Sequence, residues 1–425
     1  MDFRFLSLSQ GCSANVGEGE QIASLLRNLG GIPDANEPDL IVFNLCCVKG
    51  CRSALSLVKK NKSTHPRAAL LATGCLSVDL RAELKRLDEK ISILGANAWE
   101  MLAEAVDEIL KGRCFEFPIN AKHGVLNTGR IRKNPVIGIV PVSRGCLDAC
   151  AFCVTRLIKG VHESYPENQI LEEIRAHLQA GCREIWLTGQ DAGCYGFERS
   201  SNLARLVRLI LETFPDEFLL RLGMGNPRHI FSYWEELANI LQDPRVFTFL
   251  HLPVQSGSDA VLQRMGRQHK TSDFLKLVEG LRQQVPDLTL STDLIVGFPG
   301  ETSQDFAATL QLLRAVHPAV INMARFVVRP GTLASRMPDR VPREEIHARS
   351  LELSLLIAEI SRKQNQESVG RLEDVIVEEP GKAGDVIART IQYRPVALHQ
   401  EIPLGSRVCV KINNADTFTL HGVIV

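Results

Sequence analysis

The sequence has no hydrophobic run long enough to span a membrane and no excess of charge of either sign. Its 425 residues carry 49 Lys and Arg against 49 Asp and Glu, so the formal net charge is zero. Balanced charge gives no global electrostatic attraction to nucleic acid, and any RNA-binding surface must therefore be local. The N-terminus runs directly into a strand pattern without a signal peptide, so we expect a cytoplasmic protein with no membrane association.

The twelve cysteines predict metal or redox chemistry rather than disulfides, because cytoplasmic thiols stay reduced. Three of them form the run Cys146-x3-Cys150-x2-Cys153, and no fourth cysteine follows at ferredoxin spacing. Three thiolates on one loop can hold three irons of a [4Fe–4S] cluster and leave the fourth iron open to another ligand. The alternatives are chance clustering or a zinc knuckle, which usually needs a further Cys or Cys/His pair that is missing here.

Residues 1–130 are predicted to form an α/β domain around a parallel sheet. Short apolar runs alternate with helical segments, as is typical of a parallel sheet covered on both faces. The predicted strands are 3–9, 40–45, 68–72 and 91–94, and the predicted helices are 18–29, 53–62, 79–88 and 98–110. A polar connector over 121–134, with Arg130, Arg132 and Lys133, is predicted to be a solvated linker, and the alternative is a basic hinge facing RNA.

Three further cysteines, Cys12, Cys46 and Cys75, each end or follow a predicted strand. Residues just past the strands of an open parallel sheet lie along one carboxyl edge, so these thiols can meet in space. Three thiolates, again not four, suggest a second cluster with an open iron. The alternative is that small apolar side chains simply fill the strand ends, as buried free cysteines often do.

Residues 131–365 are predicted to form a partial TIM-type barrel of about six β-α units. The predicted strands cover 136–140, 184–188, 218–222, 247–251, 288–295 and 321–326. Polar and glycine-rich segments follow these strands, at the end of a barrel where ligands bind. Five residues there are candidates to contact a ligand, although each could equally serve a turn: Gln190, Asp191, Gln255, Asp293 and Gly297. Asp293 lies within an apolar strand and needs a partner, because an unpaired buried carboxylate is unfavourable.

The cysteine loop is the signature of the radical S-adenosylmethionine (SAM) enzymes, which this stretch resembles, with Phe152 in the usual aromatic position before the last cysteine. The resemblance implies that SAM binds the open iron and that one electron cleaves it to a 5′-deoxyadenosyl radical. Cys146, Cys150 and Cys153 are then the catalytic cluster ligands. Phe152 would lie beside the adenine, and the five strand-end candidates would complete the SAM site.

Three motifs resemble the N-terminal domain of the radical SAM methylthiotransferase family: Gly11-Cys12-x-x-Asn15, Asn44-Leu45-Cys46 and Gly74-Cys75-Leu76. The resemblance implies a second [4Fe–4S] cluster that presents a sulfur methylated by a second SAM. Cys47 stands beside Cys46, so either thiol is a possible third ligand, and the motif register favours Cys46. The remaining cysteines outside any ligand motif are predicted to be core fillers: Cys114, Cys182, Cys194 and Cys409.

Segments 189–196 and 221–227 resemble the archaeal and eukaryotic branch of that family, which acts on N6-threonylcarbamoyladenosine in tRNA. The resemblance implies methylthio transfer to C2 of this nucleoside next to the anticodon, with two SAM and two clusters. It also implies the anticodon stem-loop and an electron donor of flavodoxin or ferredoxin type as partners, and we expect a monomer. The alternatives are methylthiolation of a ribosomal-protein side chain or of a different modified adenosine.

Residues 366–425 are predicted to form a small all-β barrel that resembles a TRAM domain, an RNA-binding module. A long helix over 341–365 leads to five predicted strands: 372–379, 385–390, 396–398, 406–412 and 418–425. This part carries six Lys and Arg against eight Asp and Glu, a net charge of minus two, which is unlike a basic RNA-binding footprint. One hypothesis is a local RNA patch of Arg389, Tyr393, Arg394 and Lys411, and the alternative is a purely stabilising barrel.

Overall fold

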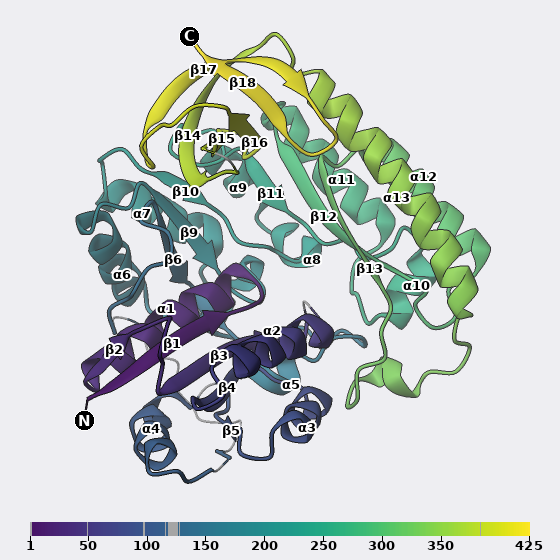
Figure 1. Ribbon diagram of the computed structural model, residues 1–425. Helices are drawn as coiled ribbons and strands as arrows, with labels where there is room; N and C mark the ends of the chain where they lie inside the picture. The colour runs from purple at the N-terminus through teal and green to yellow at the C-terminus, as the bar shows by residue number, and fades with distance from the viewer. Residues whose placement is uncertain are drawn as a thin grey trace.

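The computed structural model describes residues 2–48, 50–96, 98–114, 116–117, 126, 128–382 and 384–425. An α/β sheet, an open barrel and a small closed barrel follow one another along the chain (Figure 1). None of the helices in these ranges is long and apolar enough to cross a membrane. The predicted connector over 121–134 lies partly outside the described residues, and the domain boundaries at 130 and 365 stay predictions.

The N-terminal part is a five-stranded parallel sheet in the order β2-β1-β3-β4-β5. Its strands are β1 (Phe3–Ser9), β2 (Gly31–Pro33), β3 (Leu40–Cys46), β4 (Ala69–Cys75) and β5 (Ser92–Ile93). Its helices are α1 (Ser13–Asn28), α2 (Cys51–Thr64), α3 (Val78–Leu87) and α4 (Leu102–Leu110). Helices α2 and α3 pack on one face of the sheet and α1 and α4 on the other, so every residue of β3 is buried. The predicted parallel α/β arrangement is confirmed.

Helix α1 begins at Ser13, five residues before the predicted start at 18. Glycines in the first two turns weaken the helical signal there, because glycine is a poor helix former. The structure gives Gly17 a packing role instead: a Cβ at this position would lie 2.8 Å from Cγ2 of Ile139 in the barrel. The missing side chain therefore lets the N-terminal part approach the barrel closely.

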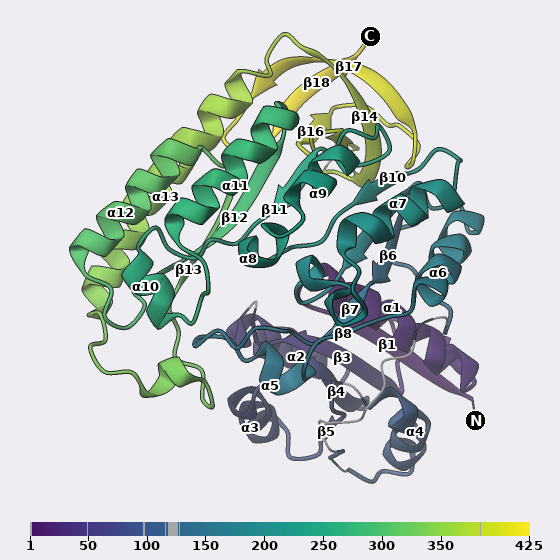
Figure 2. The ribbon, with the colours of Figure 1, turned by 180° about the vertical axis from the view of Figure 1, so that it is seen from behind.

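The central part consists of two three-stranded parallel sheets, β6-β9-β10 and β11-β12-β13, joined by a bridge between Leu220 and Val246. The strands are β6 (Ile137–Pro141), β9 (Glu184–Thr188), β10 (Leu219–Arg221), β11 (Phe249–His251), β12 (Thr289–Val296) and β13 (Val320–Arg325). Helices on the outside include α6 (Glu167–Gln179), α7 (Leu203–Thr213), α9 (Trp234–Ile240), α11 (Thr271–Gln284) and α12 (Ser303–Val316). Figure 2 shows these helices from behind, and the predicted partial barrel is confirmed.

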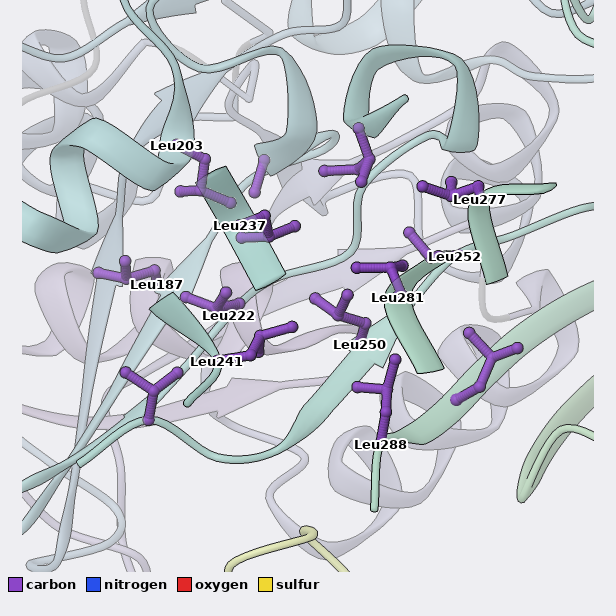
Figure 3. Packing of buried hydrophobic residues seen from close by; sticks show 14 of the residues in the cluster. Leu187, Leu203, Leu222, Leu237, Leu241, Leu250, Leu252, Leu277, Leu281 and Leu288 are labelled. Atoms are coloured by element: carbon purple, nitrogen blue, oxygen red, sulfur yellow. The ribbon is translucent and has the colours of Figure 1, made fainter. Parts of the chain in front are cut away.

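The barrel core is built mainly from leucines that strands and helices contribute from both sides (Figure 3). Leu187 and Leu250 come from the strands, whereas Leu237, Leu277 and Leu281 come from the outer helices. Each is at most 2 % exposed. Fully burying one such side chain contributes about 1.5–3 kcal/mol, so this core fixes the strand ends on which the site is built.

Arg130 joins the N-terminal part to the central barrel. The connector was expected to be a solvated linker, or alternatively a basic hinge facing RNA, and Arg130 has neither role. Its side chain is 1 % exposed and forms an ion pair with Glu173 of α6. Its guanidinium also donates a hydrogen bond of 2.7 Å to the carbonyl of Gly17 in α1. A buried charge is stable only when paired, so Arg130 holds α1 and α6 together.

The C-terminal part is a closed five-stranded barrel in the order β14-β15-β16-β18-β17, which confirms the predicted all-β barrel. Its strands are β14 (Leu372–Pro380), β15 (Val386–Thr390), β16 (Pro395–Leu398), β17 (Arg407–Ala415) and β18 (Leu420–Ile424). Helix α13 (Arg343–Gln366) crosses the outside of the central barrel before this part begins (Figure 1). Closure removes the exposed strand edges that a small sheet would otherwise carry.

The proposed RNA patch on this small barrel is wrong for three of its four residues. Tyr393 packs against Trp186, Phe247 and Phe249 of the central barrel, with ring centroids 6.3, 4.9 and 5.0 Å away. The Arg221 guanidinium lies 4.8 Å from the centre of the same ring.

Two arginines of the patch are also used inside the protein. Arg389 forms an ion pair of 3.0 Å with Glu378, and Arg394 donates to the carbonyl of Gln364 and the hydroxyl of Ser368. Arg394 thereby ties the C-terminal barrel to α13, whereas the pair of Arg389 and Glu378 joins two strands of the barrel itself. Only Lys411 of the four is exposed.

Two buried carboxyl groups meet at this attachment. Glu184 of β9 and Glu378 of β14 are both fully buried, and they lie close enough to influence each other's pKa. Burial raises the pKa of both carboxyls, and the nearby Arg389 partly offsets the rise for Glu378. A carboxyl whose pKa is higher in the folded state favours folding below its unfolded pKa, and this contribution is lost as the pH rises through the folded value.

We therefore expect Glu184→Gln, which is neutral at every pH, to raise Tm at about pH 8 by about 2–4 °C and to have less effect at about pH 5. Differential scanning fluorimetry across this range measures the effect. The control is Glu217→Gln, because Glu217 is an exposed residue 3.6 Å from Arg407. A pH-independent effect of Glu184→Gln would contradict the assignment.

Candidate functional site

The cysteine loop follows β6 and is held by backbone hydrogen bonds to the segments around it. Gly145 has a φ of +69°, and a Cβ there would lie 2.2 Å from the carbonyl oxygen of Val161, so only glycine fits. The amide of Ala151 donates to Met265 at 2.8 Å, and its carbonyl accepts from Ala334 at 2.8 Å. The loop is therefore fixed before any ligand binds.

The three thiols of this loop are free, close to one another and partly exposed. Burial raises the pKa of Cys146 to about 12, with a further rise from the charge of Asp191. Burial also raises the pKa of Cys150, although the Arg267 guanidinium, 3.6 Å from its sulfur, opposes the rise. Positive charge thus stabilises a thiolate at Cys150, which is the form that binds iron.

A single ion does not suit this cysteine loop. Three potential ligand atoms within 4.8 Å of one another occur at one place among the described residues, and that place is Asp191, Cys194 and His229. The three sulfurs of the loop do not all lie within that distance of one another. Three thiols on one loop are a suitable donor set for a [4Fe–4S] cluster, in which each sulfur binds a separate iron.

Two of the predicted SAM contacts, Gln190 and Gln255, have local features that favour a binding role. The amide oxygen of Gln190 is buried and has no hydrogen-bond partner in the described part of the chain, so a ligand would satisfy it. Gln255 is 9 % exposed and has a φ of +74°, a strained value for a residue other than glycine. Such strain is concentrated at functional sites, and both positions stay candidate SAM contacts.

The other predicted SAM contacts already have partners. Phe152 packs edge-on against Phe298, with ring centroids 6.5 Å apart. Asp293 has the expected partners, since it accepts from Asn322 and bonds to His251, both at 2.9 Å. Gly297 has a φ of +77°, and its amide donates to Glu301 at 2.8 Å. Their contact with SAM stays a prediction.

Asp191 is the predicted contact whose surroundings differ most from the expectation. One carboxylate oxygen accepts from the amides of Gly193 and Asn226, each at 3.0 Å, and the other lies 2.8 Å from Nδ1 of His229. The carboxylate is 4 % exposed. Asp191 therefore organises the loops after β9 and β10, and a role in SAM binding stays a prediction.

Cys12, Cys46 and Cys75 meet at the carboxyl edge of the N-terminal sheet, as predicted from their strand-end positions. Cys46 and Cys75 are register partners in β3 and β4, and their side chains hydrogen-bond to each other. Cys12 caps the start of α1 close enough for Cys46 to influence its pKa, which burial raises. Cys47 is also buried, and burial together with the charges of Cys46 and Cys51 raises its pKa to about 11.

Buried asparagines fix this second group of cysteines. Asn15 is 1 % exposed, and its amide donates at 3.0 Å to the carbonyl of Leu45. Its amide oxygen accepts from Cys75 at 3.6 Å. Asn44 in turn donates to the carbonyl of Asn15 at 2.6 Å. The asparagines of the two motifs therefore hold the cysteines rather than a ligand.

Lys159 connects the two cysteine groups, and no motif or periodicity in the sequence indicates this role. It ends α5 (Thr155–Lys159), directly after the cysteine loop, and its side chain is 2 % exposed. Its ammonium lies 2.5 Å from a carboxylate oxygen of Glu18 in α1. Burial alone would lower the pKa of Lys159, but the charges of Glu18, Cys75 and Cys12 raise it above its ordinary value. A cation thus lies beside the second group of thiols.

An open cavity of about 960 Å³ runs along the cysteine loop. Cys150 and Cys153 line it, together with Arg144 and Arg156. Apolar residues at its mouth are strongly exposed: Leu157 by 56 %, Val161 by 61 % and Leu333 by 65 %. The volume is at the upper end of small-molecule pockets, and the apolar mouth is suited to a second, larger reactant.

Three family profiles match the chain: "Radical SAM superfamily" over residues 140–313, "TRAM domain" over 366–425 and "Uncharacterized protein family UPF0004" over 4–95. In the solved structures, the radical SAM methyltransferase TsrM from Kitasatospora setae has the same overall fold. Its TM-score is 0.56 at 14 % identity, covering 88 % of this chain and 77 % of that one. The fold, the cysteine loop and these profiles define a radical SAM enzyme with a C-terminal TRAM domain.

Relatives that match most of this chain show which family of radical SAM enzymes it belongs to. A "Probable threonylcarbamoyladenosine tRNA methylthiotransferase" of Pyrococcus abyssi is 35 % identical over 98 % of both chains. Proteins of Drosophila melanogaster and Homo sapiens named "Threonylcarbamoyladenosine tRNA methylthiotransferase" are 34 % and 35 % identical. They match 98 % and 87 % of this chain, and 76 % and 64 % of their own length.

The chain belongs to this family of threonylcarbamoyladenosine tRNA methylthiotransferases, which confirms the predicted resemblance. It is an enzyme that transfers sulfur-containing groups, and its radical SAM domain implies SAM and a [4Fe–4S] cluster as cofactors.

The buried ion pair leads to a prediction about stability. Lys159→Met leaves Glu18 without its cation in a largely buried position, and we expect a loss of about 3–5 kcal/mol in the free energy of unfolding. The double variant Lys159→Met/Glu18→Gln should recover part of the loss, because no unpaired charge remains. Urea unfolding followed by circular dichroism measures both.

The control for this prediction is Lys62→Met. Its ammonium lies 3.0 Å from Asp88 on the surface, where the lysine side chain is 40 % exposed. An exposed pair of this kind is worth at most about 1 kcal/mol. Equal losses for Lys62→Met and Lys159→Met would contradict the role of the buried pair.

Proposed function

We propose that this enzyme transfers a methylthio group to C2 of N6-threonylcarbamoyladenosine, next to the anticodon of tRNA. The relatives described above carry this nucleoside in their names. The reaction would use two SAM and two [4Fe–4S] clusters, one for each group of three cysteines. The observation that carries the proposal is the meeting of Cys12, Cys46 and Cys75 at one edge of the sheet, linked through Lys159 to the cysteine loop.

In the proposed site Cys146, Cys150 and Cys153 hold the cluster that supplies a radical from SAM, and the second group holds the cluster that supplies sulfur. Each group offers three thiols, which leaves one iron of each cluster open to a reactant. Arg267 favours the thiolate of Cys150, and the asparagines around Cys75 keep its sulfur in position. Cys46 is favoured over Cys47 as a ligand, because it faces Cys75 directly.

The tRNA would approach through the open cavity. A modified adenosine of the anticodon loop is single-stranded, so its base can enter a pocket without opening a duplex. The apolar mouth of Leu157, Val161 and Leu333 suits contact with the base, and Arg156 at the same mouth can meet the backbone phosphates. The electron donor of flavodoxin or ferredoxin type, the monomeric state and the cytoplasmic location stay predictions.

Substitutions in the two cysteine groups should have different effects on the products that the enzyme forms. With anaerobically reconstituted enzyme, SAM, reductant and tRNA that carries the threonylcarbamoyl group, Cys150→Ala should form no 5′-deoxyadenosine and no methylthiolated nucleoside. Cys75→Ala should still form 5′-deoxyadenosine but no methylthiolated nucleoside. Liquid chromatography with mass spectrometry measures both products. Cys114→Ala, which removes an exposed cysteine outside both groups, is the control.

Purified ribosomal protein in place of tRNA tests the alternative substrate in the same assay. Methylthiolated product from the Cys75→Ala enzyme would refute the role of the second group. Methylthiolation of ribosomal protein, with none in tRNA, would refute the proposed substrate.

Cys46 and Cys47 give a sharper comparison, because they are adjacent and both buried. We expect Cys46→Ala to bind about half the iron of the wild type after anaerobic reconstitution, as one of two clusters is lost. Cys47→Ala should keep the full iron content. Iron analysis together with Mössbauer spectroscopy measures the clusters, and the opposite pattern would make Cys47 the ligand.

A further inference from the structure

Cys194 matches no cluster motif, but it lies in a buried group of metal-binding side chains outside both cysteine groups. Cys194, Asp191 and His229 each offer a ligand atom, and these atoms lie within 4.8 Å of one another. All three residues are at most 3 % exposed. A fourth side chain, His162, is 3 % exposed, and its Nδ1 lies 3.3 Å from the Cys194 sulfur.

We propose that the enzyme contains a mononuclear zinc site with four ligands: Cys194, His229, His162 and Asp191. Zinc in proteins prefers four ligands in a tetrahedron, at ~2.0–2.3 Å from thiolate, imidazole and carboxylate atoms. Ligand atoms at such distances lie about 3–4 Å from each other. The spacings of 2.8 Å between Asp191 and His229, and of 3.3 Å between Cys194 and His162, need little adjustment to reach that geometry.

Both histidines have the outer partners that zinc-binding histidines usually have. Nε2 of His229 lies 3.6 Å from Asp148, and Nε2 of His162 lies 3.2 Å from Ser164 and 3.7 Å from Glu198. With Nδ1 of each ring on the metal, the opposite nitrogen carries a proton and faces these groups. Carboxylates in this position orient the ring and raise its basicity.

The charges of the proposed ligands balance the charge of a zinc ion. His229 lies between two carboxylates, with Nδ1 2.8 Å from Asp191 and Nε2 3.6 Å from Asp148. Arg228, 3.0 Å from Asp148, neutralises the second carboxylate. A divalent ion bound by the Cys194 thiolate, the Asp191 carboxylate and two neutral histidines would leave the site without net charge.

The site lies directly beneath the cysteine loop. Asp148 belongs to that loop, between Cys146 and Cys150, and the backbone of Leu147 hydrogen-bonds to the Cys194 thiol. The zinc ligands come from three separate segments, two of which follow barrel strands β9 and β10. Zinc would therefore tie the loop that carries the catalytic cluster to the barrel, as a structural site rather than a catalytic one.

Metal analysis of the intact enzyme tests this proposal. The enzyme is expressed in zinc-supplemented medium, purified anaerobically with both cysteine groups filled with iron, and passed through gel filtration in EDTA. We expect about one zinc ion per chain by mass spectrometry of the metals. X-ray absorption at the zinc edge should show one sulfur and three nitrogen or oxygen ligands. Iron-filled enzyme without zinc, or zinc with several sulfur ligands, would overturn the proposal.

Substitutions of single cysteines test whether Cys194 binds the zinc ion. Cys194→Ala and the size-matched Cys194→Ser should lower zinc by about tenfold or more while the iron content is unchanged. Cys182→Ala is the matched control, because Cys182 is also buried and its sulfur lies 3.9 Å from Nδ1 of His177. The residues that the structure describes place no such group of three ligand atoms around it. Retention of zinc in folded Cys194→Ser enzyme, with its thermal unfolding unchanged, would overturn the assignment.

Discussion

The buried ion pair of Lys159 and Glu18 determines how the two cysteine groups face each other. A lysine ammonium with almost no exposure to water is stable only beside an opposite charge, so α5 and α1 must keep one fixed separation. Helix α5 continues directly from the cysteine loop, and α1 starts at Cys12. One electrostatic requirement thereby sets the position of the cysteine loop relative to the second group of cysteines, although they belong to different parts of the fold.

The surroundings of the site use polar side chains for support more than for ligand binding. Asn15 and Asn44 bond to backbone around the second cysteine group, and Asp191 bonds to three donors between barrel strands. Each of these groups is buried, where an unsatisfied polar atom is unfavourable, so each holds its neighbours tightly. The amide oxygens of Asn44 and Gln190 are both buried without a hydrogen-bond partner among the described residues.

The C-terminal barrel is attached to the central barrel through Tyr393. The guanidiniums of Arg221 and Arg389 each lie 4.8 Å from the centre of this ring, so the contact combines apolar packing with cation–π attraction. Among the described residues of the C-terminal barrel, four cations are exposed: Arg371, Lys382, Arg407 and Lys411. Phe418 is also 65 % exposed, so these side chains and not Tyr393 form the free surface of the TRAM domain.

The sequence by itself determined the elements and the cysteine groups. Apolar periodicity is local, so strands β1 and β3 could be predicted almost to the residue, whereas β4 runs three residues past its predicted end. The parallel-sheet rule brought Cys46 and Cys75 together. The three-residue strand β2 was too short to carry a pattern. Only the tertiary structure decided that Lys159 pairs with Glu18, that Tyr393 faces inward and that Cys194 meets two histidines. These contacts join residues far apart in the chain, and their choice depends on how whole elements pack rather than on any local pattern.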